Sequence, residues 1–211
     1  MAYDLEQQEQ LDAIKAWWTT YGTRLVALVV IVIVAVSAWF GWREWQNRQA
    51  EQAAVIYDEL TAAVTAGDMV KVEQTTGRLT DDFGRTTYAS MAAMQLAKLK
   101  VDASDLQAAR TQYDAAIAHS RAPEIAALAR LRKASVLIDL KEPDEAIKTL
   151  ATEPPEAFVA LYADRRGDAY RAQDKLDDAR REYRTAIDKL QARDTGLRNL
   201  IQVKLDSLGE G

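Results

Sequence analysis

The sequence contains no cysteine and only one histidine among its 211 residues. The absence of cysteine excludes a disulfide framework and any thiolate chemistry. The single histidine, His119, has no companion histidine, aspartate or glutamate at the spacing that metal ligands need. Because His119 follows an alanine-rich helical run, we expect it at a helix end or facing solvent.

Sequence motifs of enzymes are missing as well. There is no phosphate-binding glycine loop, no nucleophile elbow and no zinc motif. Paired carboxylates such as Asp177-Asp178 are adjacent in the chain, so on a helix they point in different directions. The arginines of segments 165–166 and 180–184 have acidic neighbours, which favours a solvated, paired surface over an anion site. We therefore predict no enzyme activity, no metal and no cofactor.

The sequence has no excess of positive charge. It carries 27 basic and 32 acidic residues, a net charge of −5, which argues against a nucleic-acid partner. The acidity is uneven, because residues 49–159 sum to −5 and residues 160–211 to +1. This asymmetry either guides a partner electrostatically or belongs to an ordinary solvated helical surface.

Proline and glycine are scarce, with 4 and 9 residues, and no segment alternates apolar and polar residues long enough for a sheet. After Trp45 the pattern stays helical to the C-terminus. Short breaks interrupt it at 67–68, 84 and 102–105, and Pro123, Pro143 and Pro155 each precede a new helical run. The breaks predict helices of about 10–18 residues with turns of about 2–5 residues, and therefore an all-α fold of stacked antiparallel pairs.

One long uncharged run lies near the N-terminus. Residues 25–42 read LVALVVIVIVAVSAWFGW and lie between Arg24 and Arg43. As a helix they would rise about 27 Å, close to the hydrocarbon thickness of a bilayer. The flanking arginines can reach opposite interfaces, and tryptophans suit one of them. The run predicts a single transmembrane helix that includes Leu25, Val30, Val34, Trp39 and Trp42.

Two alternatives to a transmembrane anchor exist. A buried core helix usually carries a polar stripe, whereas only Ser37 interrupts this run. A cleaved signal peptide would fit the small residues of segment 36–38. However, aromatic residues extend the apolar stretch beyond that point, and the preceding residues 1–24 carry a net charge of −2. We favour an uncleaved anchor.

A shorter segment, residues 5–21, precedes the run. Leu11, Ile14 and Trp18 recur at helical spacing, which predicts an amphipathic helix lying on the membrane surface. The alternative is a poorly ordered tail with incidental aromatic residues. Gly22 permits a bend before the spanning helix.

A repeat is visible in the C-terminal part. A small residue is followed twelve positions later by an alanine and four positions after that by an apolar or aromatic residue. The second and third copies lie 33 residues apart and the first and second 37, near the tetratricopeptide period. The residues of the pattern, with two further matches in the third copy, are Ala97, Ala109, Tyr113, Ala134, Ala146, Leu150, Gly167, Tyr170, Ala179, Tyr183 and Ala186.

Packing explains the pattern. A small residue on the first helix of a pair and an alanine on the second let two backbones approach closely, and a large side chain fills the space between pairs. Residues 50–81 add a further helical pair that the pattern does not align. We therefore expect a tail with an interfacial helix (1–20), a transmembrane helix (21–45) and a tetratricopeptide-like α-solenoid (46–211).

Such solenoids present a concave surface that can hold a peptide or a partner domain. Methionine suits adaptable apolar contacts, although Met91 and Met94 could equally belong to the core. The candidate contact residues, all on the first helices of pairs, are Tyr88, Met91, Met94, Gln95, Arg130 and Tyr162.

Several stretches along the whole chain resemble the YfgM family of ancillary SecYEG translocon subunits. They include Gly-Trp-Arg-Glu-Trp at 41–45 directly after the apolar run, Ala-Leu-Ala-Arg-Leu at 127–131 and Ala-Asp-Arg-Arg-Gly-Asp-Ala at 163–169. The resemblance implies a bacterial inner-membrane protein with a cytoplasmic tail, one span and a periplasmic repeat domain. It also implies as partners the translocon, the membrane-anchored periplasmic chaperone PpiD and translocating polypeptides.

The residues alone do not determine the orientation. Two basic residues precede the apolar run and two follow it closely, so the positive-inside count is a tie. Two rival functions also stay open. One is an envelope-stress regulator acting through the cytoplasmic tail, and the other is a structural subunit of another envelope assembly.

Overall fold

The computed structural model describes residues 2–209, with the side chains of residues 15–22 and 24–209. Every regular element of this part is helical, in agreement with the predicted all-α class. The elements are α1 (Ala2–Ala66), α2 (Met69–Asp82), α3 (Thr87–Asp102), α4 (Leu106–His119), α5 (Pro123–Asp139), α6 (Pro143–Thr149), the 3₁₀-helix η1 (Glu156–Phe158), α7 (Val159–Ala172), α8 (Leu176–Lys189) and α9 (Thr195–Asp206).

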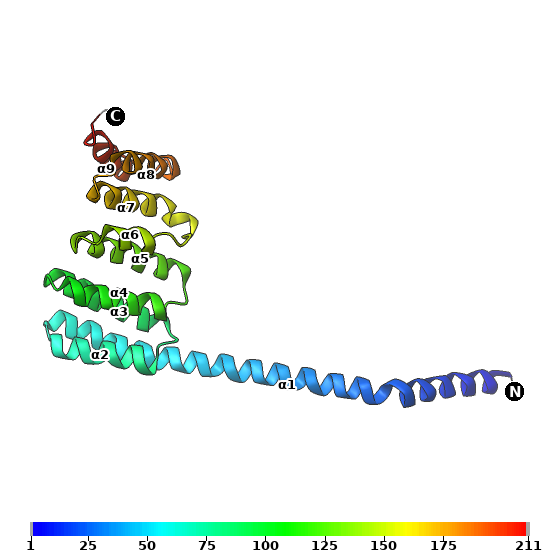
Figure 1. Cartoon of the computed structure of the whole chain (residues 1–211). Coiled ribbons are helices and arrows are strands. Elements are labelled where there is room, and N and C mark those ends of the chain that lie inside the picture. Colours follow the sequence, from blue (N-terminus) through cyan, green and yellow to red (C-terminus); the bar gives the residue numbers. More distant parts are fainter. Residues whose placement is uncertain (1, 210–211) are drawn as a thin grey trace. The chain divides into compact units, whose positions relative to one another are not determined.

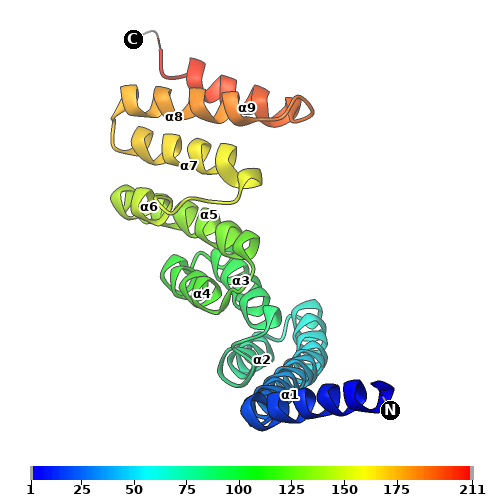
Figure 2. The same cartoon turned by 90° about the vertical axis from the view of Figure 1, so that its right-hand side faces the viewer.

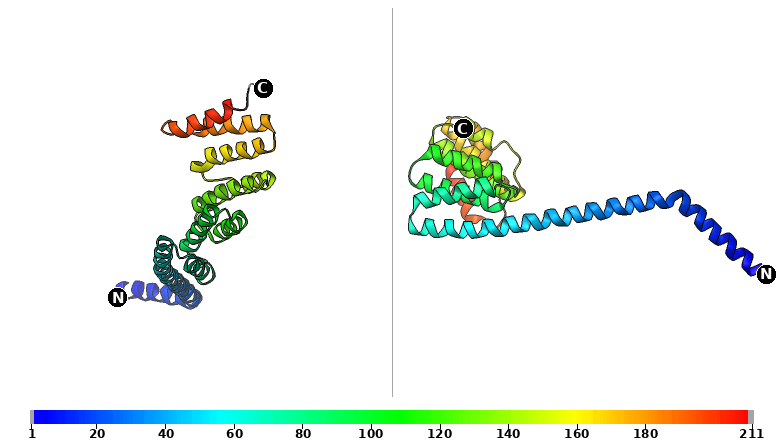
Figure 3. Two further views of the ribbon diagram at one scale, coloured as in Figure 1. Left: turned by 90° about the vertical axis from the view of Figure 1, so that its left-hand side faces the viewer. Right: turned by 90° about the horizontal axis from the view of Figure 1, so that it is seen from below.

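By its internal contacts the chain divides into two units, one up to Arg48 and one from Gln49 onward. The described residues of the first unit all belong to α1, whose last part, residues 49–66, belongs to the second unit. The predicted separate helices before and after Gly22 form one continuous helix, which bends in its blue N-terminal part without ending (Figure 3). The predicted amphipathic segment is helical, whereas the side chains of Leu11 and Ile14 lie outside the described residues.

The second unit is a stack of antiparallel helix pairs (Figures 1 and 2). The end of α1 pairs with α2, α3 with α4, α5 with α6 and α7 with α8, and α9 lies against α8 at the end of the stack. Each second helix also contacts the first helix of the next pair. This connectivity is that of a helical-repeat solenoid, in which each pair touches only its neighbours.

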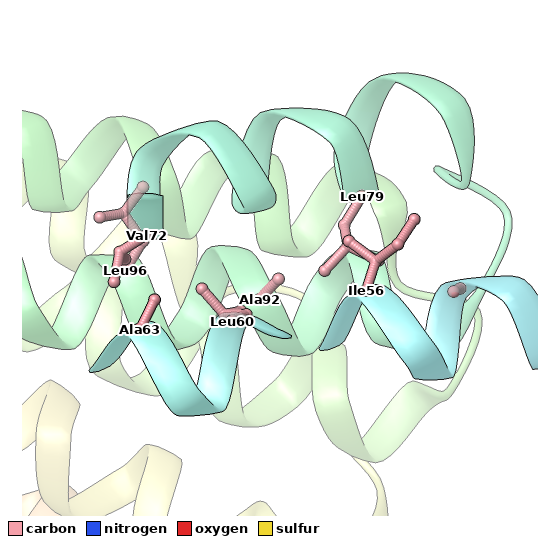
Figure 4. Packing of buried hydrophobic residues seen from close by; sticks show 8 residues of the cluster. Ile56, Leu60, Ala63, Val72, Leu79, Ala92 and Leu96 are labelled. Atoms are coloured by element: carbon pink, nitrogen blue, oxygen red, sulfur yellow. The ribbon is translucent and has the colours of Figure 1, made fainter. Parts of the chain in front are cut away.

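The core follows the stack as four separate clusters rather than one centre. In the first cluster, Ile56, Leu60 and Ala63 of α1 face residues of α2 and α3 (Figure 4). Val72 and Leu79 of α2 belong to the same cluster, as do Ala92 and Leu96 of α3. A local core of this kind is what a solenoid requires, because no pair can bury its apolar face alone.

The turns within pairs reveal the repeat more regularly than the sequence pattern does. Each contains one residue with positive φ: Gly67 (72°), Ser104 (60°), Lys141 (65°) and Asp174 (60°). In every case the next backbone N–H donates to a carbonyl five residues earlier, at 2.8–3.0 Å. This bond closes the first helix and turns the chain into the second. The spacing of 37, 37 and 33 residues makes the end of α1 and α2 a fourth copy of the repeat.

One helix is shorter than predicted. The second helix of the third pair, α6, ends at Thr149, whereas α4 and α8 have 14 residues each. Pro154 prevents α6 from reaching the length of α4 and α8, because the residue before a proline disfavours the helical conformation. The guanidinium of Arg166 donates to the carbonyl of Leu150 at 3.4 Å and so satisfies this end of the helix.

Candidate functional site

The apolar run lies exposed along α1 in the described structure. The predicted transmembrane residues Leu25, Val30, Val34, Trp39 and Trp42 are between 43% and 62% exposed. A helix of a soluble core would bury a stripe of such residues. Here none of the most apolar window is buried, and the helix is long and apolar enough to cross a membrane once. The core-helix alternative therefore does not describe this segment.

Aromatic side chains gather at both ends of the run. At one end the ring centroids of Trp17 and Tyr21 are 6.0 Å apart. At the other end the Arg43 guanidinium lies 5.5 Å from the centroid of the Trp39 ring. Tryptophan and tyrosine concentrate at membrane interfaces, where their rings are half solvated. The two groups therefore mark the two edges of an apolar segment of bilayer thickness.

The structure brings the repeat residues together as three packing sites. All are buried except Tyr170, which is half-buried at the edge of the last cluster. Ala97, Ala109 and Tyr113 share one cluster. Ala134, Ala146 and Leu150 share the next, and Ala179, Tyr183 and Ala186 form the centre of the last.

Gly167 of α7 and Tyr183 of α8 approach each other closely. A Cβ atom at Gly167 would lie 2.5 Å from Cε1 of the Tyr183 ring, so only glycine fits there. The ring covers the backbone of α7, and its hydroxyl donates to a carboxylate oxygen of Asp168 at 2.8 Å. The motif at 163–169 therefore has a structural role in joining α7 to α8.

A buried ionic network extends this contact to α9. Lys204 of α9 donates to the carboxylates of Asp164 at 2.7 Å and Asp168 at 2.9 Å, and both aspartates are less than 9% exposed. Burial raises the pKa of Asp164, while the hydrogen bond from Lys204 opposes this shift. Removing the lysine would leave the buried Asp164 without its ion-pair partner and Asp168 with Arg165 alone, so Lys204 links α9 to α7.

Buried tyrosines should make the solenoid sensitive to alkali. Burial, followed by the charge of Asp168, raises the pKa of Tyr183 above its ordinary value of 10.0. The pKa of Tyr162 is also raised by burial. Below pH 10 each phenol is neutral in both the folded and unfolded states. Above pH 10 the unfolded phenol ionises first, so each such tyrosine lowers the free energy of unfolding by up to about 1.4 kcal/mol per pH unit.

We therefore expect urea unfolding, followed by far-ultraviolet circular dichroism, to show constant stability from pH 7.5 to 9 and a steep loss above pH 10. Tyr183→Phe should cost about 1 kcal/mol at pH 8, because it removes a hydrogen bond, and should make the loss above pH 10 less steep. If the free energy of unfolding fell equally steeply above pH 10 in both proteins, the pKa of Tyr183 would not be raised by folding.

The candidate contact residues divide into two groups. Met94 and Tyr162 are buried, 8% and 1% exposed, and the Tyr162 hydroxyl donates to the carbonyl of Ala127 at 3.1 Å. They are therefore core residues. Each lies on the face of its helix that points toward the adjacent helix, whereas other positions of the same helix point to solvent. Met91 is 37% exposed.

Three other candidates are only partly covered. Gln95 and Arg130 are partly exposed, and Tyr88 packs its ring against Tyr57, with centroids 5.4 Å apart. A partner role for these residues and for Met91 stays a prediction.

The sequence patterns did not predict a groove that lies between α5 and α7. It has a volume of about 490 Å³ and includes Ser135, Ile138, Lys141, Arg165 and Arg171 in its lining. Arg165 belongs to a basic pair that looked neutralised from its sequence neighbours. Its ion pair with Asp168, at 3.3 Å, indeed exists, but the side chain still lines the groove. Only the stacking of two pairs creates this surface, so no local sequence signal marks it.

Several other charged side chains form ion pairs. Arg180 binds Asp177 at 2.7 Å, as the neighbouring charges predicted, whereas Arg166 binds Glu182 of the next helix at 2.9 Å. His119 ends α4 with Nδ1 at 3.1 Å from the carbonyl oxygen of Gly84. Among the described residues no group of three histidine or acidic side chains is placed to hold a metal ion.

The fold and the anchor define a class: a tetratricopeptide-like repeat protein with one membrane-spanning helix. Residues 15–210 match the family described as "Tetratricopeptide repeat-like domain". The chain is 31% identical to a protein of Neisseria gonorrhoeae named "Ancillary SecYEG translocon subunit", over 99% of this chain and 100% of that one. Proteins of the same name from Escherichia coli (29% identity, 96% of both chains) and Aggregatibacter actinomycetemcomitans (28%, 99% and 100%) are also similar. The chain belongs to this family, the YfgM family of ancillary translocon subunits.

Proposed function

We propose that this protein is a scaffold anchored in the bacterial inner membrane beside the SecYEG translocon. Its repeats lie on the periplasmic side and bring newly translocated polypeptides into contact with the chaperone PpiD. The observation that carries the proposal is the near full-length similarity to subunits named for the translocon, which includes both the span and the repeats. The tail, by contrast, is short and faces the cytoplasm.

The physical role of the anchor is to raise local concentration. A solenoid tethered within a few nanometres of the translocon exit meets emerging chains at an effective concentration on the order of millimolar. Individually weak contacts then suffice for capture and release. The exposed grooves between helix pairs provide such contacts, and the ionic networks that hold the pairs together provide a rigid frame.

The absence of cysteine allows one experiment to test orientation and partners together. Met91→Cys would place a unique thiol on the exposed side of α3. We expect a membrane-impermeant maleimide photocrosslinker to label it in intact spheroplasts, and illumination to yield adducts with SecY and PpiD. Lys15→Cys, before the apolar run, should be labelled only after lysis.

The outcomes separate the parts of the proposal. Labelling of the Met91→Cys variant only after lysis would contradict the periplasmic placement. Labelling in spheroplasts without translocon or chaperone adducts would contradict the partners. Adducts with an outer-membrane complex alone would favour the structural-subunit alternative, and a stress phenotype that survives deletion of residues 50–211 would favour the regulator.

A further inference from the structure

The turn residues with positive φ align the first helices of the pairs with one another. The last helix joins this series, because Gly209 after α9 has φ 74° and lies 35 residues beyond Asp174. From Ser104 onward, the positions nine and six residues before each turn residue are therefore equivalent. They are Gln95 and Lys98 in α3, Arg132 and Ser135 in α5, Arg165 and Asp168 in α7, and Leu200 and Val203 in α9. We call this set the first-helix ladder.

The middle of the ladder is cationic. The groove between α5 and α7 contains ladder residues from both helices and, next to them, Lys141 and Arg171. Both of these side chains are exposed, and neither forms a salt bridge within the described part of the chain. The two carboxylates of Asp164 and Asp168 are balanced by the two cations Arg165 and Lys204. Asp139 adds one exposed negative charge, so the positive charge of the groove exceeds the negative charge left in it.

The last step of the ladder is apolar. Leu200 is 55% and Val203 66% exposed, although terminal helices of solenoids normally present polar outer faces. Leu200 lies one helical turn before Lys204, whose ammonium group contacts Asp168 in the wall of the cationic groove. The apolar pair therefore lies on the helix that Lys204 joins to the groove wall, although no residue of α9 lines the groove itself.

We infer that the ladder from α5 to α9 binds an extended polypeptide segment in which acidic residues adjoin large apolar side chains. The carboxylates would lie against Lys141 and Arg171, and the apolar side chains against Leu200 and Val203. Charge complementarity selects this occupant, because an acidic segment gains from cations that no internal partner uses. The inference rests on the proposed scaffold function and names the class of its ligand.

The test uses the full chain in lipid nanodiscs and fluorescence anisotropy of a labelled peptide, with empty nanodiscs as the blank. The probe is a twelve-residue peptide that contains the block Asp-Glu-Asp-Leu-Phe-Leu. We expect it to bind at 50 mM NaCl and to bind about fivefold or more weakly at 500 mM NaCl. A peptide with Asn-Gln-Asn in place of the acidic block, and one with three serines in place of the apolar block, should each bind at least about fivefold more weakly.

Matched variants locate the site. Lys141→Gln with Arg171→Gln, and separately Leu200→Ser with Val203→Ser, should weaken binding of the probe by about fivefold or more. Lys71→Gln with Arg184→Gln removes two other exposed cations, and Val55→Ser with Val70→Ser removes two other exposed valines. These control pairs should bind as the unaltered protein does.

Equal affinity for the acidic and amide peptides, or equal losses in test and control variants, would overturn the inference. The result is independent of the crosslinking outcome. Peptide binding at this ladder by a protein that gives no translocon adduct would contradict the proposed function and leave the ligand class standing. Translocon adducts without peptide selectivity would support the proposed function and contradict the ligand class.

Discussion

Gly167→Ala is expected to destabilise the C-terminal pairs of the solenoid by about 2–4 kcal/mol. The new Cβ would lie 2.5 Å from Cε1 and 2.6 Å from Cδ1 of the Tyr183 ring. The ring has no room to move, because Tyr183 is fully buried and its hydroxyl is bonded to Asp168. Alanine gains about 1 kcal/mol in helix propensity over glycine, which is too little to offset the clash.

Gly77→Ala provides the matched control. Gly77 lies within α2, and a Cβ there would meet no atom within 4 Å. This substitution should raise stability by about 0.5–1 kcal/mol through helix propensity alone. Urea unfolding of both variants, followed by circular dichroism at 222 nm, should therefore show shifts of opposite sign. Shifts of the same sign would mean that the contact between Gly167 and Tyr183 does not limit the approach of α7 and α8.

The second large effect concerns the anchor. Val30→Arg with Val34→Arg places two charges one helical turn apart in the middle of the apolar run. Each arginine at the centre of a membrane helix costs about 2.5–3.5 kcal/mol, so together they add about 5–7 kcal/mol. We expect carbonate extraction of cell membranes, followed by immunoblotting, to move most of the protein into the soluble fraction.

Val55→Arg with Val70→Arg is the control for this experiment. These valines are 62% and 68% exposed, comparable with Val30 and Val34, but lie outside the run. The control protein should stay in the membrane pellet. Release of the unaltered full-length chain by carbonate would contradict the membrane anchor itself.

Sequence patterns predicted the features that depend on local periodicity. The run at 25–42 is recognisable because an apolar helix without a polar stripe has few stable surroundings other than lipid. The positions from Ala97 to Ala186 are recognisable because close helix packing restricts side-chain size, and small residues recur at the repeat period. The pairing of Arg180 with Asp177 was likewise predictable, because these residues lie three positions apart in the chain.

Other features escaped because the interactions that define them are not local. In the first helix pair, Leu60 stands where later copies have a small residue, Val72 where they have alanine and Thr76 where they have a large residue. The sequence pattern therefore does not detect this pair, whereas the turn at Gly67 does. Met94 and Tyr162 have the chemistry of contact residues, and only their neighbours in space identify them as core.

By itself, the sequence determined that this protein is helical, contains repeated helix pairs and has one apolar anchor segment. Each of these properties depends on the spacing of residues along one helix or one helix pair. Tertiary structure alone decided which surfaces are available. The groove between α5 and α7 and the network of Lys204 with Asp164 and Asp168 arise where one pair stacks on the next. The physical reason is that burial and charge pairing depend on residues 30 to 40 positions apart, whose contact no local period encodes.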